Sequence, residues 1–130
     1  MKKSALSRRA ALAGGAALGS AALLRPAHAQ QPPVRIGVMA DQSSYGSSVG
    51  GVGAVLAARM AAADFGPTVL GLPIEILDVD TQNKPDIGST AARAWFDQGV
   101  DVVVDMPATP VAVAATQIAY ERKKLAMICA

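Results

Sequence analysis

Cysteine and histidine, two residue types that commonly carry catalysis or bind metals, are almost absent from this sequence. The 130 residues include one cysteine, Cys129, and one histidine, His28. A single thiol cannot close a disulfide within the chain, and no cluster of cysteine and histidine with metal-ligand spacing is present. Because Cys129 follows the apolar pair Met127 and Ile128, we interpret it as a small buried residue of a strand.

Charged residues are missing from a run of 15 residues near the N-terminus, from Ala10 to Leu24. Basic residues precede this run, and a box of small residues that ends at Ala29 follows it. The order predicts a signal peptide over residues 1–29 that is cleaved after Ala29, since a membrane span needs about 20 apolar residues. The pair Arg8-Arg9 favours the twin-arginine route. The general secretory route and a retained N-terminal anchor or helix are the alternatives.

Basic charge becomes scarce once the predicted signal is removed. The signal holds five of the twelve basic residues and none of the ten acidic ones, so residues 30–130 carry 7 − 10 = −3 charges. No basic patch is left to favour nucleic acid as a partner. His28 leaves with the signal as well, so neither a Ser-His-Asp nor a Cys-His arrangement can be assembled. The sequence therefore predicts a protein that is not an enzyme, with no catalytic residue, no metal site and no cofactor.

Patterns of strands and helices alternate from residue 34 onward. Apolar runs predict four strands, over residues 34–40, 72–80, 100–105 and 125–129. Helical periodicity predicts three helices, over residues 52–63, 85–98 and 111–122. The order β-α-β-α-β-α-β with short connections predicts an α/β fold with a parallel sheet and helices on its faces. In the first helix, the residues expected to face the sheet are Val52, Val55, Leu56, Met60 and Ala63.

A polar turn connects the second predicted strand to the second predicted helix. Pro85 disfavours helical geometry at Lys84, so we expect the helix to begin at Pro85 with Asp86 in its first turn. The alternative is that Asn83 caps the helix while Asp86 reaches back to it. In either case Trp95 lies on the inner face of this helix and is expected to pack on the sheet.

Two strand ends have an unusual composition, and open parallel sheets bind ligands beyond the carboxyl ends of their strands. The first is the serine-rich stretch over residues 42–48, and the second runs over residues 105–110. Thr109 followed by Pro110 predicts a helix N-cap, which would leave backbone amides available to bind a carboxylate. The alternatives are a flexible solvated loop for the first stretch and a plain helix cap for Thr109.

Two weaker signals for chemistry are also present. Asp78 and Asp80 share one strand face, which would suit a pair of carboxylates in acid-base catalysis, but we favour a solvated strand end. Gly51-Val52-Gly53 resembles part of a dinucleotide fingerprint. It lacks the third glycine and lies about ten residues beyond its strand, so nucleotide binding is disfavoured.

Longer segments of the sequence resemble a known family. VRIGVMAD (residues 34–41) with its Ser/Tyr/Gly loop, and QNKPDIG followed by ARAWFDQGVD (residues 82–101), resemble the substrate-binding proteins of ABC transporters, of the leucine/isoleucine/valine-binding type. The resemblance runs from about Val34 to Ala130. It implies that residues 30–130 form the first part of the N-terminal lobe of a type I periplasmic-binding-protein fold. Family members are far longer, so we expect the chain to be a fragment or a truncated reading frame.

The resemblance also implies which residues contact the ligand. In the family, the loop after the first strand contributes contacts, and the corresponding residues here are Ser43, Ser44 and Tyr45. The loop after the third strand usually carries a serine that holds the ligand's carboxylate. Thr109 occupies that position and keeps a hydroxyl, whereas Ala108 replaces a commonly polar neighbour. These five residues are the expected substrate-binding site.

The function implied by the resemblance is capture of an amino acid or a similar small carboxylate in the periplasm and its delivery to a membrane permease. The small-molecule ligand and the permease are then the partners, and no chemistry is performed. Two alternatives stay open. One is the ligand-sensing ectodomain of a receptor, which uses the same fold, and the other is a nucleotide-dependent enzyme on a Rossmann-like sheet.

Overall fold

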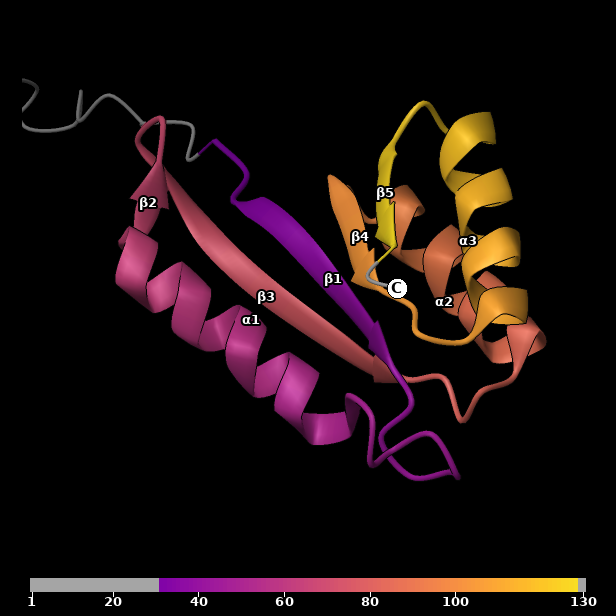
Figure 1. Ribbon diagram of the computed structural model, residues 1–130. Helices are drawn as coiled ribbons and strands as arrows, with labels where there is room; N and C mark the ends of the chain where they lie inside the picture. The colour runs from indigo at the N-terminus through magenta and orange to yellow at the C-terminus, as the bar shows by residue number, and fades with distance from the viewer. Residues whose placement is uncertain (1–30, 129–130) are drawn as a thin grey trace, which may run out of the picture. The chain divides into compact units, whose positions relative to one another are not determined.

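The computed structural model describes residues 31–128, which form a mixed α/β unit (Figure 1). Its elements in chain order are β1 (Val34–Ala40), α1 (Gly51–Phe65), β2 (Thr68–Val69), β3 (Leu72–Asp80), α2 (Pro85–Asp97), β4 (Val102–Asp105), α3 (Thr109–Glu121) and β5 (Leu125–Ile128). The predicted signal peptide and Cys129 lie outside the described residues. Within residues 31–128, no helix is both long and apolar enough to cross a membrane.

The sheet has five strands in the order β2-β3-β1-β4-β5. β1 pairs in parallel with β3 on one side and with β4 on the other, and β5 pairs in parallel with β4. The predicted α/β fold with a parallel sheet is therefore confirmed for these four strands. The structure adds a short strand that the sequence pattern does not predict, β2, which pairs antiparallel with β3 at the sheet's edge. Leu70 and Gly71 connect β2 to β3 with positive φ at both residues, which is the pattern of a type I′ turn in a two-residue hairpin.

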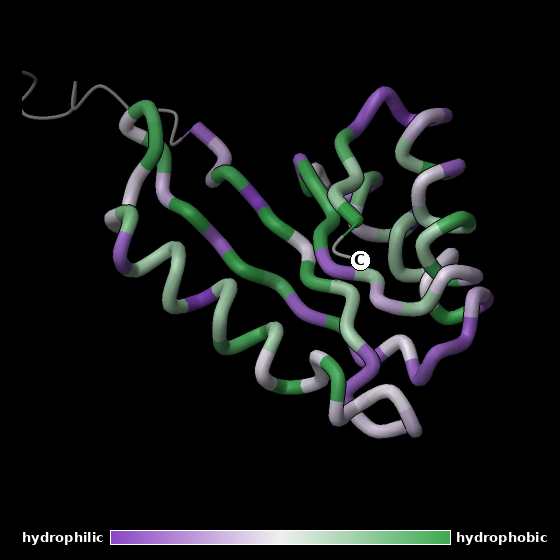
Figure 2. The backbone as a smooth tube through the Cα atoms, in the orientation of Figure 1, coloured by the Kyte–Doolittle hydropathy of each residue, from purple (hydrophilic) through white to green (hydrophobic). Residues whose placement is uncertain are grey.

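Helices cover both faces of the sheet, as Figure 1 shows. α1 lies over β1 and β3, where Val38 and Ala40 form a small apolar core with Val55. α2 and α3 pack on the opposite face, where Met39 and Val103 join a larger apolar core. Neighbouring residues of β1 thus point to opposite faces, which is the period of two that a strand imposes. Figure 2 shows the apolar residues that run along β1 and β3 between these layers.

The predicted inner face of α1 is wrong in part. Val55 is buried, as expected. The other four predicted members are exposed: Val52, Leu56, Met60 and Ala63. Ala54 and Ala58 pack beside Val55 against the sheet instead. Because α1 is apolar nearly all round, its periodicity does not single out one face.

The start of α2 agrees with the prediction. α2 begins at Pro85, and Asp86 lies in its first turn, where a negative charge is favourable. Lys84 is the N-cap residue and has an extended backbone, so the alternative cap by Asn83 is wrong.

Close packing brings α2 onto the sheet. Trp95 packs against the larger core, as predicted, and a Cβ atom on Gly37 would lie 2.5 Å from Trp95 Cε3. The next strand begins at Val102 and not at residue 100. The reason is that the amide of Val100 donates to the carbonyl of Trp95 (2.9 Å) and belongs to the turn that follows α2.

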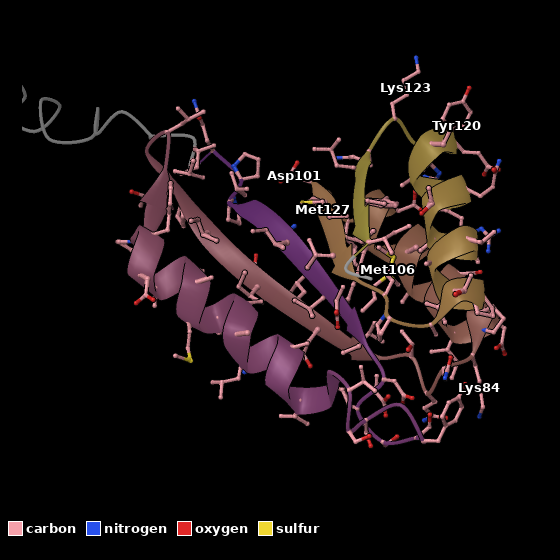
Figure 3. All side chains as sticks on the ribbon, viewed as in Figure 1. Lys84, Asp101, Met106, Tyr120, Lys123 and Met127 are labelled. Atoms are coloured by element: carbon pink, nitrogen blue, oxygen red, sulfur yellow. The ribbon has the colours of Figure 1, made fainter. Side chains whose placement is uncertain are left out.

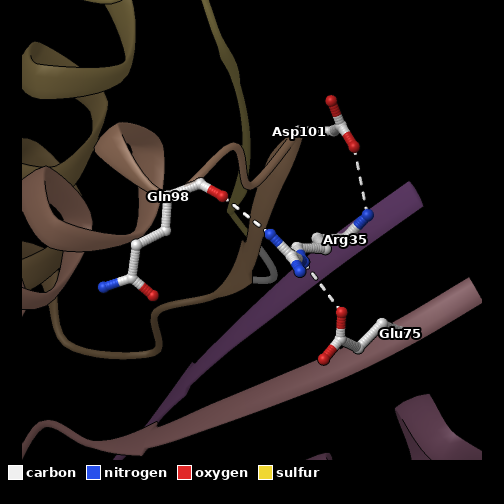
Figure 4. A network of polar contacts seen from close by, with 4 residues as sticks. All are labelled: Arg35, Glu75, Gln98 and Asp101. Carbon is white, nitrogen blue, oxygen red and sulfur yellow. Dashed lines mark hydrogen bonds and ion pairs between the residues drawn. The ribbon is translucent and has the colours of Figure 1, made fainter. Parts of the chain in front are cut away.

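A polar network at the amino end of β1 ties the sheet to the end of α2 (Figure 4). Arg35 Nε donates to Glu75 Oε2 on β3, and Arg35 Nη1 donates to the carbonyl of Gln98, both at 2.7 Å. The amide of Arg35 donates to Asp101 Oδ2 at 3.0 Å. Because these side chains keep contact with solvent, we expect the ion pair to contribute about 1 kcal/mol or less to stability.

Candidate functional site

The loops that leave β1, β3 and β4 lie next to one another, because these strands are neighbours in the sheet. The register pairs Ala40 with Asp80, and Met39 with Asp105, so the carboxyl ends of the three strands are level. We name the residues at this end, 41–48, 80–82 and 105–109, the carboxyl-edge site. Figure 3 shows Lys84 at this end of the sheet and Asp101 at the opposite end.

Asp41 closes the loop after β1 on itself. Its side chain is almost fully buried, with the residue 1% exposed. Asp41 Oδ1 accepts from the amide of Ser44 (2.9 Å), and Oδ2 accepts from the amide of Gly46 (2.9 Å) and from the Ser44 hydroxyl. The hydroxyl of Ser44, together with these amides, holds the pKa of Asp41 below its ordinary value of 3.8 despite the opposing effect of burial. Asp41 is therefore ionised at neutral pH.

Asp80 fastens the same loop to the end of β3. Its Oδ1 accepts from the amides of Gln42 (2.8 Å) and Gln82 (3.0 Å), and its Oδ2 accepts from the Ser43 hydroxyl. The hydrogen bond from the Ser43 hydroxyl, with smaller contributions from these amides, lowers the pKa of Asp80 below 3.8. Asp80 is thus a structural anchor for two loops and more than a solvated strand end.

Asp78 faces different partners from Asp80. Its Oδ1 accepts from Arg59 Nη2 on α1 at 2.6 Å, and its Oδ2 accepts from the side-chain amide of Gln42 at 3.2 Å. The two carboxylates therefore serve separate contacts, and the arrangement gives no support to a catalytic carboxylate pair.

Asp105 is a third carboxylate at this end, and the sequence reasoning did not single it out. Its Oδ2 is buried and accepts no hydrogen bond from the residues that the structure describes. Burial raises the pKa of Asp105 above 3.8. Asp105 and Met106 have φ of 79° and 62°, a backbone region that is unfavourable for residues other than glycine. The sequence signal for a buried carboxylate here is an aspartate directly after three consecutive valines.

The structure places the predicted contacts on two loops of neighbouring strands. Ser43 and Tyr45 are exposed, Tyr45 to 86%, and Ser44 is partly buried in the loop after β1. Ala108 is partly buried and Thr109 is exposed where the loop after β4 enters α3. Both groups therefore lie at the carboxyl edge of the sheet, each on its own loop.

The prediction that Thr109 is the N-cap of α3 is wrong by one residue. Ala108 is the N-cap, because its carbonyl accepts the first bond of the helix from the amide of Ala112 at 2.9 Å. Thr109 is the first residue of α3, and no side chain caps this helix. The hydroxyl of Thr109 therefore does not cap the helix.

The carboxyl-edge site is suited to holding a small polar solute. It offers serine hydroxyls on a braced loop and the N-terminus of α3, whose first-turn amides have no acceptor within the helix. Within residues 31–128, no group of three potential metal-ligating side chains gathers in one place. An apolar cavity of about 430 Å³ lies elsewhere, between α1 and the amino-terminal halves of β1 and β3. Aliphatic and aromatic residues line it, so it offers little to orient a polar ligand.

Comparisons connect the chain with known proteins. A family model described as periplasmic binding protein matches residues 33–130. A comparison with curated proteins found no match. Among solved structures, a periplasmic binding protein from Burkholderia mallei is 38% identical with a TM-score of 0.70, over 74% of this chain and 26% of that one.

Two further structures are ABC transporter components. A branched-chain amino acid ABC transporter periplasmic ligand-binding protein from Burkholderia xenovorans is 36% identical with a TM-score of 0.65, over 73% of this chain and 26% of that one. A solute-binding protein of an ABC transporter from Rhodopseudomonas palustris, in complex with 3,4-dihydroxybenzoic acid, is 22% identical with a TM-score of 0.65, over 75% and 27%. The last of these supports the fold alone.

The chain spans about a quarter of the length of these structures. Its mostly parallel five-stranded sheet matches their type I fold. The family model covers nearly all of the residues that the structure describes. The chain belongs to the periplasmic binding protein family.

Proposed function

We propose that this chain is part of an extracytoplasmic solute-binding protein of an ABC transporter. It captures an amino acid or a similar small carboxylate for delivery to a membrane permease, and it performs no chemistry on the solute. The observation that carries the proposal is the carboxyl-edge site, where the loops of three neighbouring strands meet the start of a helix. Open α/β sheets bind their ligands at this end.

The start of α3 supplies hydrogen-bond donors for a carboxylate. The first amides of a helix have no acceptor within the helix, and the helix dipole favours negative charge at this end. Thr109 adds an exposed hydroxyl next to Ala108, the N-cap residue. In this account Thr109 and Ala108 contact the solute's carboxylate.

The loop after β1 contacts the remainder of the solute. Asp41 and Asp80 hold this loop through hydrogen bonds to its amides and hydroxyls, so Ser43 and Ser44 are presented in a fixed arrangement next to Tyr45. A binding group that is already held in place loses less entropy when the ligand arrives. Tyr45 contributes an exposed ring that can pack on the solute and a hydroxyl that can bind it.

Export to the periplasm places the protein where this function is needed. We infer that residues 1–29 direct export by the twin-arginine route and that cleavage follows Ala29. The order of basic residues, uncharged run and small-residue box supports this inference. Mass spectrometry of the protein from the periplasm should find Gln30 at the N-terminus, and a mature protein that starts at Met1 would contradict the inference.

Replacing Thr109 by alanine tests the proposed function. Loss of a hydrogen bond to a charged group should weaken binding of a small carboxylate by about tenfold or more, as measured by isothermal titration calorimetry on the full-length gene product. Thr116→Ala is the matched control, because Thr116 is exposed on the same helix away from the carboxyl-edge site. Equal affinities in the wild-type protein and in Thr109→Ala would remove Thr109 from the binding site.

A further inference from the structure

We propose that Asp80 fixes the polarity of Ser43, so that this serine accepts a hydrogen bond from the bound solute and does not donate one. The inference rests on the proposed function, in which Ser43 contacts the solute. It assigns Asp80 as a positioning residue that acts through Ser43. It also assigns a chemical requirement to the solute: besides a carboxylate, the solute carries an ammonium or hydroxyl group that donates to the loop after β1.

The carboxylate of Asp80 is held from both sides. Asp80 is the last residue of β3, and its Oδ1 accepts amides from two different loops, from Gln42 at 2.8 Å and from Gln82 at 3.0 Å. These contacts fix the plane of the carboxylate and direct Oδ2 toward Ser43. Oδ2 then accepts from the Ser43 hydroxyl.

The hydroxyl proton of Ser43 can take only one position beside the ionised carboxylate of Asp80. An ionised carboxylate is only an acceptor, so the single hydroxyl proton of Ser43 is committed to Asp80. Ser43 is exposed at the carboxyl edge, and only the lone pairs of its oxygen are left for a solute. A donor group can use these lone pairs. A carboxylate of the solute would instead place oxygen against oxygen with no proton between them.

The neighbouring serine repeats the arrangement. The hydroxyl of Ser44 donates to Asp41, which is buried and also accepts the amides of Ser44 and Gly46. Ser43 and Ser44 therefore both present acceptors. The start of α3 presents donors, so the two sides of the carboxyl-edge site have opposite polarity and orient a solute that carries both kinds of group.

Asp80→Asn reverses this polarity with almost no change of shape. The side-chain oxygen of the asparagine still accepts hydrogen bonds from the amides of Gln42 and Gln82. The NH2 group of the asparagine takes the place of Oδ2 beside Ser43. The NH2 group donates to the Ser43 oxygen, so the hydroxyl proton of Ser43 turns toward the solute. Ser43 then becomes a donor and should tolerate a solute without its own donor.

Matched pairs of solutes measure the effect in the full-length gene product. L-leucine is compared with 4-methylpentanoate, which lacks only the ammonium, and 3,4-dihydroxybenzoate with benzoate, which lacks the hydroxyls. We expect the wild-type protein to bind the donor-bearing member of at least one pair about tenfold more tightly or better. The two pairs distinguish an ammonium from a hydroxyl as the donor. In Asp80→Asn, and likewise in Ser43→Ala, this ratio of affinities should fall about tenfold.

Asp78→Asn is the matched control for charge. It removes the same charge two residues away on β3, but Asp78 contacts Arg59 and Gln42 and not Ser43. The ratio should therefore be kept in Asp78→Asn, and an equal fall there would overturn the inference in favour of a general charge effect.

The outcomes separate the inference from the proposed function. If the ratio of affinities is unchanged in folded Asp80→Asn, the inference is overturned. If the variant still binds these solutes, the proposed function stands. If Asp80→Asn fails to fold, Ser43→Ala decides, since an unchanged ratio in that variant removes Ser43 as the acceptor. Binding of none of the four solutes by the wild-type protein overturns the proposed capture of small carboxylates.

Discussion

Individual aspartates at the carboxyl edge respond to acid in opposite directions. Hydrogen bonds from Ser44 and Ser43 lower the pKa of Asp41 and Asp80 below 3.8 in the folded protein. Their contribution to stability is therefore fully present above pH 3.8 and is lost as the pH falls through the lowered values. Burial raises the pKa of Asp105. Its ionisation therefore takes stability away as the pH rises above 3.8 and through the raised value.

Asp105→Asn should make the protein more stable at neutral pH. The asparagine keeps the shape of the side chain but cannot ionise where Oδ2 is buried without a hydrogen bond. We expect the free energy of unfolding to rise by up to about 1 kcal/mol at pH 7, because the partial exposure of Asp105 screens its charge. Urea denaturation at pH 7 and at pH 3.5 measures the difference, which should be larger at pH 7.

Asp64→Asn controls for the loss of one negative charge, because Asp64 is exposed on α1. Two results would contradict this account of Asp105. In one, Asp105→Asn is less stable than the wild-type protein at pH 7; in the other, its free energy of unfolding changes equally at both pH values.

Residue roles were only partly predictable from the sequence. The serine-rich composition of residues 42–48 indicates a site, but the hydrogen bond of Ser43 to Asp80 depends on the register that sets Ala40 beside Asp80. Threonine followed by proline is a common start of a helix, and this pattern predicts Thr109 as the N-cap. The observed start differs by one residue, which changes the role of the hydroxyl from cap to exposed group.

At the scale of elements, two glycines in helices have opposite surroundings. Gly88 of α2 is buried against α3, and a Cβ atom there would lie 2.7 Å from Val111 Cγ1. Gly53 of α1 has open space around its Cβ position. The same substitution at the two positions therefore separates helix propensity from helix packing.

Gly88→Ala should destabilise the protein and Gly53→Ala should stabilise it. Overpacking against Val111 should lower the free energy of unfolding by about 1–3 kcal/mol. Alanine in the open helix position should raise it by up to about 1 kcal/mol. Urea denaturation measures both changes. Adding Val111→Ala to Gly88→Ala should recover part of the loss if the clash is the cause, and a loss of equal size at both glycines would contradict the packing of α2 on α3.

Elements were more predictable than their faces. β1, β3 and the start of α2 agree with the sequence prediction because apolar runs and Pro85 mark them clearly. β2 has only two residues, too few to show a pattern, and its turn at Leu70 and Gly71 was the only signal. The sequence does not single out the inner face of α1, because apolar residues occur on nearly all sides of this helix.

At the scale of the whole molecule, the two ends of the sheet differ in how their polar groups are bonded. The amino end holds the network of Arg35, Glu75 and Asp101, whose groups satisfy one another. The carboxyl end holds exposed hydroxyls on Ser43 and Thr109 and the start of α3. The chain spans about a quarter of the length of the solved structures that it matches.

In the proposed function, the solute binds at the carboxyl edge of the sheet. Amide hydrogen exchange, followed by mass spectrometry of the full-length gene product with and without a saturating carboxylate, tests the claim most directly. Exchange should slow in residues 41–48 and 106–112 and stay unchanged near Arg35 and Asp101. Slower exchange at the amino end of the sheet, with no change in those two segments, would contradict it.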